Sequence, residues 1–327
     1  GGTKTWHDES GKTHDNASLL TLVLERTTAA NPGDSDWSSV TVNASTTEQL
    51  IWDGDSYQYT NLAKYDANHD AYTYRVRETA VQGDYVINQS VNNFVNTAYT
   101  SASKTKAFAG GWPANTTVEF TLSAKVGTAD YSLTNKTDAE GNALDLTQDV
   151  NEGSPTATWD KLKKYDENGA LITYEITETK VTIGTGADAV EYTGTAITDR
   201  WNQNDAGGTL TNTWKTTSVE GGKTWLSGTT THNNASDITL TLKRTLKPVT
   251  DTSTWETVTV TSDIEFAWTG NTYKYDKLPK YNAEGVEYEY KVEETVNIAG
   301  YVSEQSGNNF VNTELTSIEM TKQFGDE

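Results

Sequence analysis

A lysine, a glutamate and an asparagine recur in the same order three times along this chain of 327 residues. The separation from lysine to glutamate is 74, 72 and 71 positions, so the spacing is nearly constant. The separation from glutamate to asparagine is 18, 34 and 18 positions. The three sets are Lys4, Glu78 and Asn96; Lys106, Glu178 and Asn212; and Lys223, Glu294 and Asn312.

The residues around each set predict that its side chains face a hydrophobic core. Lys4 stands two positions before Trp6, and Asn96 stands two positions after Phe94. Side chains two positions apart lie on the same face of a β-strand. Unpaired polar and charged groups are costly in an apolar interior, so three buried copies of this set need a chemical reason.

Burial supplies that reason, because it favours the uncharged forms of both an amine and a carboxylic acid. A neutral lysine amine is a nucleophile, and a protonated glutamate can polarise the carbonyl group of an asparagine amide and shuttle protons. The expected product is an isopeptide bond between lysine Nζ and asparagine Cγ, with loss of ammonia. This reaction happens once and does not turn over, so we do not expect an enzyme.

Longer repeats accompany the three sets. Each lysine begins a Lys-x-aromatic motif, and a fourth such motif starts at Lys322. Later in each copy, a Tyr-Asp or Tyr-Asn turn is followed by a strand with alternating polarity. These segments are "YDANHDAYTYRVRET", "YDENGALITYEITET" and "YNAEGVEYEYKVEET". The chain is therefore predicted to be three repeats with the start of another.

Short alternating strands, turn residues and the lack of a helical pattern predict an all-β fold, a tandem array of three Greek-key β-sandwich domains. The joints lack a Pro/Gly/Ser tract, which favours stiff connections. The predicted ranges are domain 1 at 1–98, domain 2 at 99–214 with an insertion at about 180–208, domain 3 at 215–314, and a truncated next repeat at 315–327.

The Lys-x-Trp/Phe openings, the "NLAKYD" and "KLPKYN" elements, the "YRVRET" strand and the closing "FVNT" resemble the CnaB-type, Ig-like repeat domains of Gram-positive surface adhesins and pilins. The resemblance spans all three repeats. It implies an autocatalytic Lys–Asn isopeptide bond in each, with Glu78, Glu178 and Glu294 as the catalytic residues. It also implies a secreted, wall-anchored stalk that holds a terminal, host-binding domain away from the cell.

The second repeat departs from this pattern. Lys104 and Lys106 have the same strand parity, and we choose Lys106 because it precedes an aromatic residue by two. The segment 184–194 is predicted to form an extra hairpin. An adhesive module that binds host glycan or matrix protein through this insertion is the alternative function. Its candidate ligand contact is Trp201, which has no counterpart in the other repeats.

Composition excludes several classes of protein. The net charge of −21 disfavours nucleic acid and anionic lipid as partners. No apolar run is long enough to span a membrane. The chain has no cysteine, and its four histidines show no metal-ligand spacing, so we expect neither disulfides nor a metal or other cofactor. We expect a monomer whose partners are neighbouring repeats of the same chain.

Overall fold

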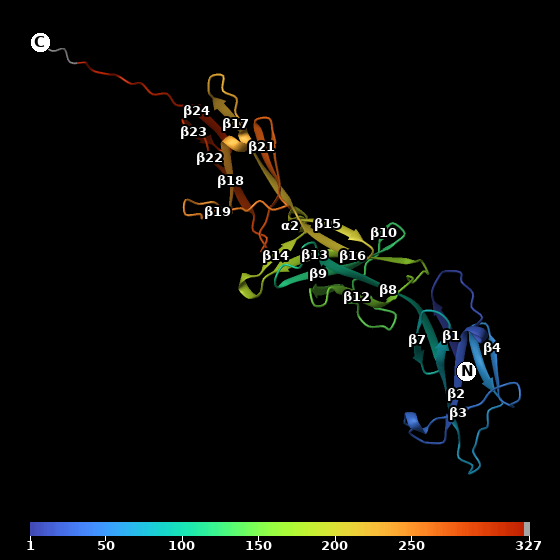
Figure 1. Ribbon diagram of the computed structural model, residues 1–327. Helices are drawn as coiled ribbons and strands as arrows, with labels where there is room; N and C mark the ends of the chain where they lie inside the picture. Colours follow the sequence, from blue (N-terminus) through green and yellow to red (C-terminus); the bar gives the residue numbers. More distant parts are fainter. Residues whose placement is uncertain (324–327) are drawn as a thin grey trace. The chain divides into compact units, whose positions relative to one another are not determined.

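The computed structural model describes residues 1–323, which form mostly β-strands (Figure 1). The chain divides into two compact units. The first unit combines Gly1–Lys106 with Val118–Thr179. The second unit combines Ala107–Thr117 with the residues from Lys180 onward. This division passes through the predicted domain at 99–214, so the three predicted domain boundaries stay a prediction.

Strands dominate the first unit, in line with its abundant Thr, Val and Tyr. In the first repeat these are β1 (Gly2–His7), β2 (Leu20–Thr27), β3 (Ser38–Val40), β4 (Gln49–Asp53), β5 (Ser56–Thr60), β6 (Thr73–Val81), β7 (Tyr85–Ser90) and β8 (Asn93–Phe108). The strands that follow are β9 (Thr116–Val126), β10 (Ala129–Asp130), β11 (Thr147–Asn151), β12 (Thr156–Lys163) and β13 (Ile172–Ile183). The short helices are α1 (Asn16–Leu19) and the 3-10 turn η1 (Asp34–Asp36).

The first repeat is a sandwich of two sheets. One sheet has the order β4-β5-β1-β8-β7, and the other has the order β3-β2-β6. Between them lies an apolar cluster of Leu24, Tyr57, Tyr59, Val76 and Phe94. Alternating strands therefore bury one face each, as the sequence pattern predicts.

The second unit contains the remaining elements. They are η2 (Gly186–Asp188), β14 (Val190–Thr193), α2 (Thr195–Arg200), β15 (Trp201–Ala206), β16 (Thr209–Trp214), β17 (Thr216–Leu226), α3 (Asn234–Asp237), β18 (Ile238–Leu246), β19 (Glu256–Thr257), β20 (Glu265–Thr269), β21 (Thr272–Pro279), β22 (Tyr288–Val296), β23 (Tyr301–Ser306) and β24 (Asn309–Glu314).

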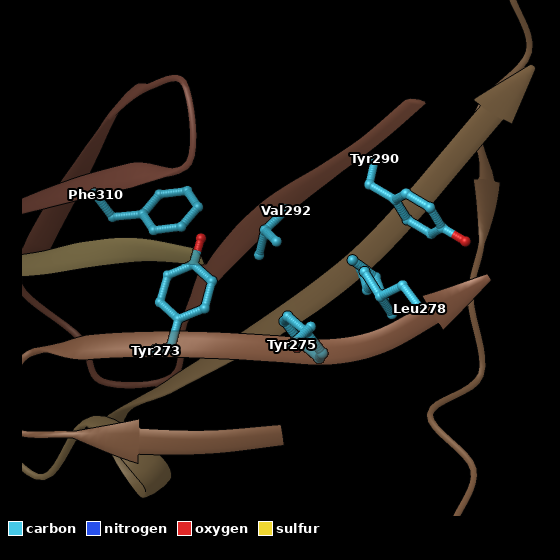
Figure 2. Packing of buried hydrophobic residues seen from close by; sticks show 7 residues of the cluster. Tyr273, Tyr275, Leu278, Tyr290, Val292 and Phe310 are labelled. Carbon is cyan, nitrogen blue, oxygen red and sulfur yellow. The ribbon is translucent and has the colours of Figure 1, made fainter. Parts of the chain in front are cut away.

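The third repeat reproduces the sheets of the first. Its sheets have the orders β20-β21-β17-β24-β23 and β19-β18-β22. Figure 2 shows the cluster between these sheets, in which Tyr273, Tyr275, Tyr290 and Phe310 surround Val292. The same strand order around an aromatic core confirms the predicted array of Ig-like β-sandwiches.

The second repeat contributes strands to both units. In the first unit, β12 pairs with β8, and β9 pairs with β10 and β11. In the second unit, Lys180–Ile183 of β13 pairs with β14, which confirms the hairpin predicted at 184–194. Within residues 1–323, no helix is long and apolar enough to cross a membrane.

Candidate functional site

Each lysine strand of the first and third repeats lies parallel and adjacent to its asparagine strand. In the first repeat, β1 pairs with β8 so that Lys4 is opposite Phe94 and Trp6 is opposite Asn96. In the third repeat, β17 pairs with β24 in the same register, with Trp225 opposite Asn312. The aromatic residue two positions after each of these lysines is therefore paired with the asparagine on the neighbouring strand.

Glu78 connects the other two members of the first set. Its Oε2 lies 3.2 Å from Lys4 Nζ, and its Oε1 accepts a hydrogen bond of 2.6 Å from Asn96 Nδ2. The side chains of Lys4 and Glu78 are both 0% exposed. Asn96 is completely buried as well. One carboxyl group therefore contacts both an amine and an amide in a site without water access.

Burial changes the acidity of the lysines. The loss of hydration lowers the pKa of Lys4 to about 8, against the opposing attraction of Glu78. Burial lowers the pKa of Lys106 to about 8 in the same way, and Glu178 opposes it. It also lowers the pKa of Lys223. The neutral amine, which is the nucleophilic form, is thus accessible near neutral pH.

The amide of Asn96 is oriented differently from the sequence-based expectation. The sequence predicted that the glutamate would contact the carbonyl oxygen of the asparagine. Instead, Glu78 contacts Nδ2, while the buried Oδ1 has no hydrogen-bond partner in the part of the chain that the structure describes. Leaving a buried acceptor without a donor costs about 1–3 kcal/mol. Glu78 is consequently placed beside the nitrogen that departs as ammonia in the predicted reaction.

The third set has the same lysine–glutamate contact with a different neighbour. Lys223 Nζ lies 3.2 Å from Glu294 Oε2 and donates a hydrogen bond of 3.3 Å to Oε1. Ser303 Oγ also donates to Glu294 Oε1, at 2.8 Å. Asn312 is fully buried, and among the described residues 1–323 neither its Nδ2 nor its Oδ1 has a hydrogen-bond partner. Ser303 lies directly opposite Asn312 across β23 and β24, a pairing that the sequence analysis missed.

The second set is divided between the two units. In the first unit, Lys106 Nζ lies 3.0 Å from Glu178 Oε2, and both side chains are almost fully buried. Lys104 is only half-buried, so the lysine against Glu178 is the one chosen from the Lys-x-aromatic motif. In the second unit, Asn212 is completely buried on β16, and its Oδ1 accepts a bond of 3.3 Å from Gln203 Nε2.

An aromatic lid, which sequence reasoning missed, covers the first lysine. We use this name for Trp6, His14 and Tyr85. The ring centroid of Trp6 lies 4.7 Å from Lys4 Nζ. His14 stacks on the indole at 4.1 Å, and Tyr85 meets it edge-on at 5.0 Å. Asn16 Oδ1 accepts a bond of 2.8 Å from the indole Nε1 and fixes its orientation.

The third repeat contains the equivalent lid. Its members are Trp225, His232 and Tyr301, and Asn234 accepts a 2.8 Å bond from the indole. The signal in the sequence is the pair of segments "HDN" at 14–16 and "HNN" at 232–234, each following a Lys-x-Trp motif.

The prediction that Trp201 contacts a ligand is contradicted by its burial. Trp201 is 1% exposed and packs among Phe108, Tyr192 and Trp214 within the second unit. An indole needs an exposed face to stack on a sugar ring, and this one has none. Trp201 is therefore a core residue of the insertion.

No metal centre is present among residues 1–323, where no three His, Asp or Glu side chains are grouped closely enough to hold an ion. The acidic turn that begins at Asp66 uses its carboxylate to hold the backbone. Its Oδ1 accepts hydrogen bonds of 2.8 Å from the backbone amides of Asn68 and Asp70. The carboxylate shapes the turn, as is typical of Asp at such positions.

Comparison with known proteins identifies one domain type along the chain. The family model of the Cna protein B-type domain matches residues 1–98, 124–213 and 219–313. No curated protein sequence matches the chain significantly.

Several solved structures are similar at low identity. Two B repeat units of the collagen binding protein of Staphylococcus aureus share 20% identity, covering 96% of this chain and 72% of that one, with a TM-score of 0.27. The major pilin T-13 of Streptococcus pyogenes shares 15% identity over 72% of this chain and 100% of that one, with a TM-score of 0.24. The major pilin subunit of Bacillus cereus shares 11% identity over 98% of this chain and 92% of that one, with a TM-score of 0.23. The family assignment rests on the family model alone.

Proposed function

We propose a mechanical function for this chain, which belongs to the Cna protein B-type domain family. It is a stalk segment of a bacterial surface adhesin or pilus-like protein, strengthened by intramolecular isopeptide bonds. The observation that supports this proposal most directly is the carboxyl group of Glu78, which contacts both Lys4 Nζ and Asn96 Nδ2 in a fully buried site. The proposed bonds join Lys4 to Asn96, Lys106 to Asn212, and Lys223 to Asn312.

The contacts of Glu78 suggest how the first bond forms. The lone pair of neutral Lys4 Nζ attacks Asn96 Cγ, and the Cγ–Nδ2 bond then breaks. Glu78 receives the proton lost by Nζ through Oε2 and delivers a proton to the departing Nδ2 through Oε1, so ammonia leaves. The product is a secondary amide, and Glu78 ends in its initial protonation state. Glu178 and Glu294 have the same role in the other two repeats.

Burial gives this reaction a thermodynamic direction. Before the reaction, the interior of the first repeat holds an amine, a carboxyl group and an amide whose Oδ1 has no donor among residues 1–323. Afterwards the amine has become part of a neutral amide, so the cost of burying a charge disappears. The bond also closes a loop of nearly the whole repeat, which by analogy with a disulfide stabilises the fold by about 4–5 kcal/mol.

The position of the bond explains its mechanical value. It joins adjacent, parallel strands at the two ends of the repeat, β1 and β8. A pull on the chain enters through one of these strands and leaves through the other, so the covalent link carries the load. The segment between Lys4 and Asn96 is then shielded from the applied force.

We further propose that the protein acts outside the cell, on the wall of a Gram-positive bacterium, where its neighbouring repeats are its immediate partners. Membership of the Cna protein B-type family supports this placement. The absence of cysteine agrees with stabilisation by another covalent link. Binding of a host ligand would belong to a different part of the full protein, and these repeats would act as a monomeric spacer.

The intact mass of the purified protein tests the proposal. A deficit of three ammonia molecules relative to the sequence mass is expected, and peptide mapping should identify the three Lys–Asn pairs. Glu78→Gln should restore one ammonia, because glutamine cannot transfer the proton. Glu25→Gln is a matched control, because Glu25 is a buried glutamate of the same repeat that pairs with Arg75 and Arg77 instead. A mass equal to that of the sequence would refute the covalent mechanism.

A further inference from the structure

One turn has very different surroundings in the first and third repeats. Tyr65 begins this turn in the first repeat and is 51% exposed. Tyr281 begins the equivalent turn in the third repeat and is only 9% exposed. The two turns are built in the same way. In each, the side chain of the residue after the tyrosine, Asp66 or Asn282, accepts hydrogen bonds from two backbone amides. The difference therefore comes from what covers the third turn.

The insertion of the second repeat covers it. Tyr192, on β14, donates a hydrogen bond of 2.8 Å from its hydroxyl to the carbonyl oxygen of Glu284. Arg200, the last residue of α2, donates a bond of 3.3 Å from Nε to the carbonyl oxygen of Gly285. In return, the hydroxyl of Tyr281 donates a bond of 3.2 Å to the carbonyl oxygen of Asp199.

Arg200 lies at the centre of these contacts. Its guanidinium carbon is 4.1 Å from the ring centroid of Tyr192 and 5.4 Å from that of Tyr281. Its Nη1 donates to the carbonyl oxygen of Ala196, which holds the side chain against its own helix. A guanidinium is attracted by the faces of aromatic rings, and this attraction strengthens when water is excluded from the contact. The side chain of Arg200 is thus held in one orientation, in which it contacts both repeats.

Backbone hydrogen bonds also connect the second and third repeats across their joint. The amide of Lys215, between β16 and β17, donates a bond of 2.8 Å to the carbonyl oxygen of Arg200. The amide of Lys280 in turn donates a bond of 3.2 Å to the carbonyl oxygen of Lys215. Lys215 is consequently hydrogen-bonded to the insertion through its amide and to the third repeat through its carbonyl oxygen.

Gly285 shows that the fit is close. It has a φ of +81°, and a Cβ added there would lie 2.3 Å from the hydroxyl oxygen of Tyr192. The tyrosine ring carbon Cζ would be 2.8 Å away. A glycine is therefore required for two reasons: the left-handed backbone conformation and the approach of the tyrosine.

From these contacts we propose that residues 184–201 form a socket whose function is to hold the turn at 281–287 and fix the joint between the second and third repeats. The partner of this surface is the next repeat of the same chain. This assignment goes beyond the proposed isopeptide bonds, because the socket acts between repeats and the bonds act within them. It also gives the insertion a use other than host-ligand binding.

The joint of the first and second repeats has a simpler contact at the equivalent turn. There the amide of Ser10 donates a bond of 3.0 Å to the carbonyl oxygen of Gly169. A Cβ at Gly169 would lie 2.4 Å from that same amide nitrogen. The turn thus approaches the preceding repeat in both cases, and the second repeat has added an aromatic and cationic socket to this arrangement.

Distance distributions between spin labels test the proposal, using the full chain, which has no native cysteine to interfere. Labels on Asn204→Cys and Glu304→Cys report on the joint, because both positions are exposed and lie in different repeats. Tyr192→Phe removes only the hydroxyl, and Arg200→Ala removes the guanidinium. Both should broaden the distribution, Arg200→Ala by roughly 2-fold, since domains without a firm interface move by default.

Two control variants separate the socket from general effects. Tyr65→Phe removes the hydroxyl of the exposed equivalent tyrosine and should change nothing. Gly285→Ala should broaden the distribution, whereas Gly300→Ala should not, although Gly300 has a similar φ of +87° with no atom near its added Cβ. Equal widths for wild type, Arg200→Ala and Gly285→Ala would overturn the socket. The intact mass of the same samples reports the isopeptide bonds separately, so the two proposals can fail independently.

Discussion

Asn96 and Lys106 lie on one uninterrupted strand, β8, which runs through the joint between the first and second repeats. Asn96 closes the first repeat, and Lys106 opens the second. Both side chains are buried, each in the core of its own repeat. If both residues are bonded as proposed, tension leaving the first isopeptide bond reaches the second through the nine intervening residues of paired β-strand. No flexible linker intervenes to absorb it.

Single-molecule stretching should therefore show no unfolding of the first repeat in the wild-type chain. Glu78→Gln should add an unfolding event that releases the 91 residues between Lys4 and Asn96. At about 3.3–3.6 Å per residue, the gain in contour length is roughly 300 Å. Glu25→Gln serves as the control and should add no event. A full-length unfolding event for the first repeat of the wild type would show that the link does not carry load.

Much of this arrangement could be predicted from the sequence because it repeats. The parity of Lys4 with Trp6, and of Asn96 with Phe94, correctly placed both polar side chains in the core. The alternating polarity of the strands and the Asp/Asn/Gly turns between them correctly predicted a β-sandwich. These features depend on local periodicity, which a single sequence records directly.

Other features depend on pairings between distant strands, and no local pattern encodes them. Ser303 lies opposite Asn312, and Gln203 lies opposite Asn212, only because of the register of two hairpins. The contact of Glu78 with Nδ2 of Asn96, and not with its Oδ1, depends on the rotation of the amide, which strand periodicity does not record. The lack of a counterpart for Trp201 does not indicate exposure, because the insertion has a small aromatic core of its own that buries this side chain.

The choice between two lysines in the second repeat can be decided by paired substitutions. Lys106→Arg should restore one ammonia to the intact mass, because the guanidinium stays protonated and is not a nucleophile. Lys104→Arg should leave the mass deficit unchanged, since Lys104 is only half-buried and Lys106 is the lysine in contact with Glu178. The measurement is the intact mass of each variant. The opposite result would assign the second bond to Lys104.

The rate of bond formation should rise with pH. The reactive form is the neutral amine, and burial lowers the pKa of Lys4 and of Lys106 to about 8. Below this value, the neutral fraction increases about tenfold for each pH unit, and above it the fraction levels off. Chain refolded from denaturant at pH 6, 7 and 8 should therefore lose ammonia progressively faster. Rates that are equal at the three pH values would argue against attack by a neutral lysine.

Trp6 should control the acidity of Lys4, and its removal provides the most specific test of the aromatic lid. Its ring lies 4.7 Å from Lys4 Nζ and keeps water from the amine. Trp6→Ala should hydrate Lys4, raise its pKa toward the ordinary 10.5, and move the pH dependence of the first bond upward. Each unit of upward shift slows the reaction at pH 7 about tenfold.

Each bond can be followed by itself through peptide mapping, so the third repeat supplies an internal control for this prediction. Trp225→Ala should slow the bond of Lys223 and leave the bond of Lys4 unchanged, because Trp225 covers Lys223 at 4.5 Å. Trp6→Phe keeps a ring over the amine and should restore most of the rate without restoring the hydrogen bond to Asn16. If Trp6→Ala lowered the rate equally at every pH, the indole would be holding the strand in place and would not be excluding water from the nucleophile.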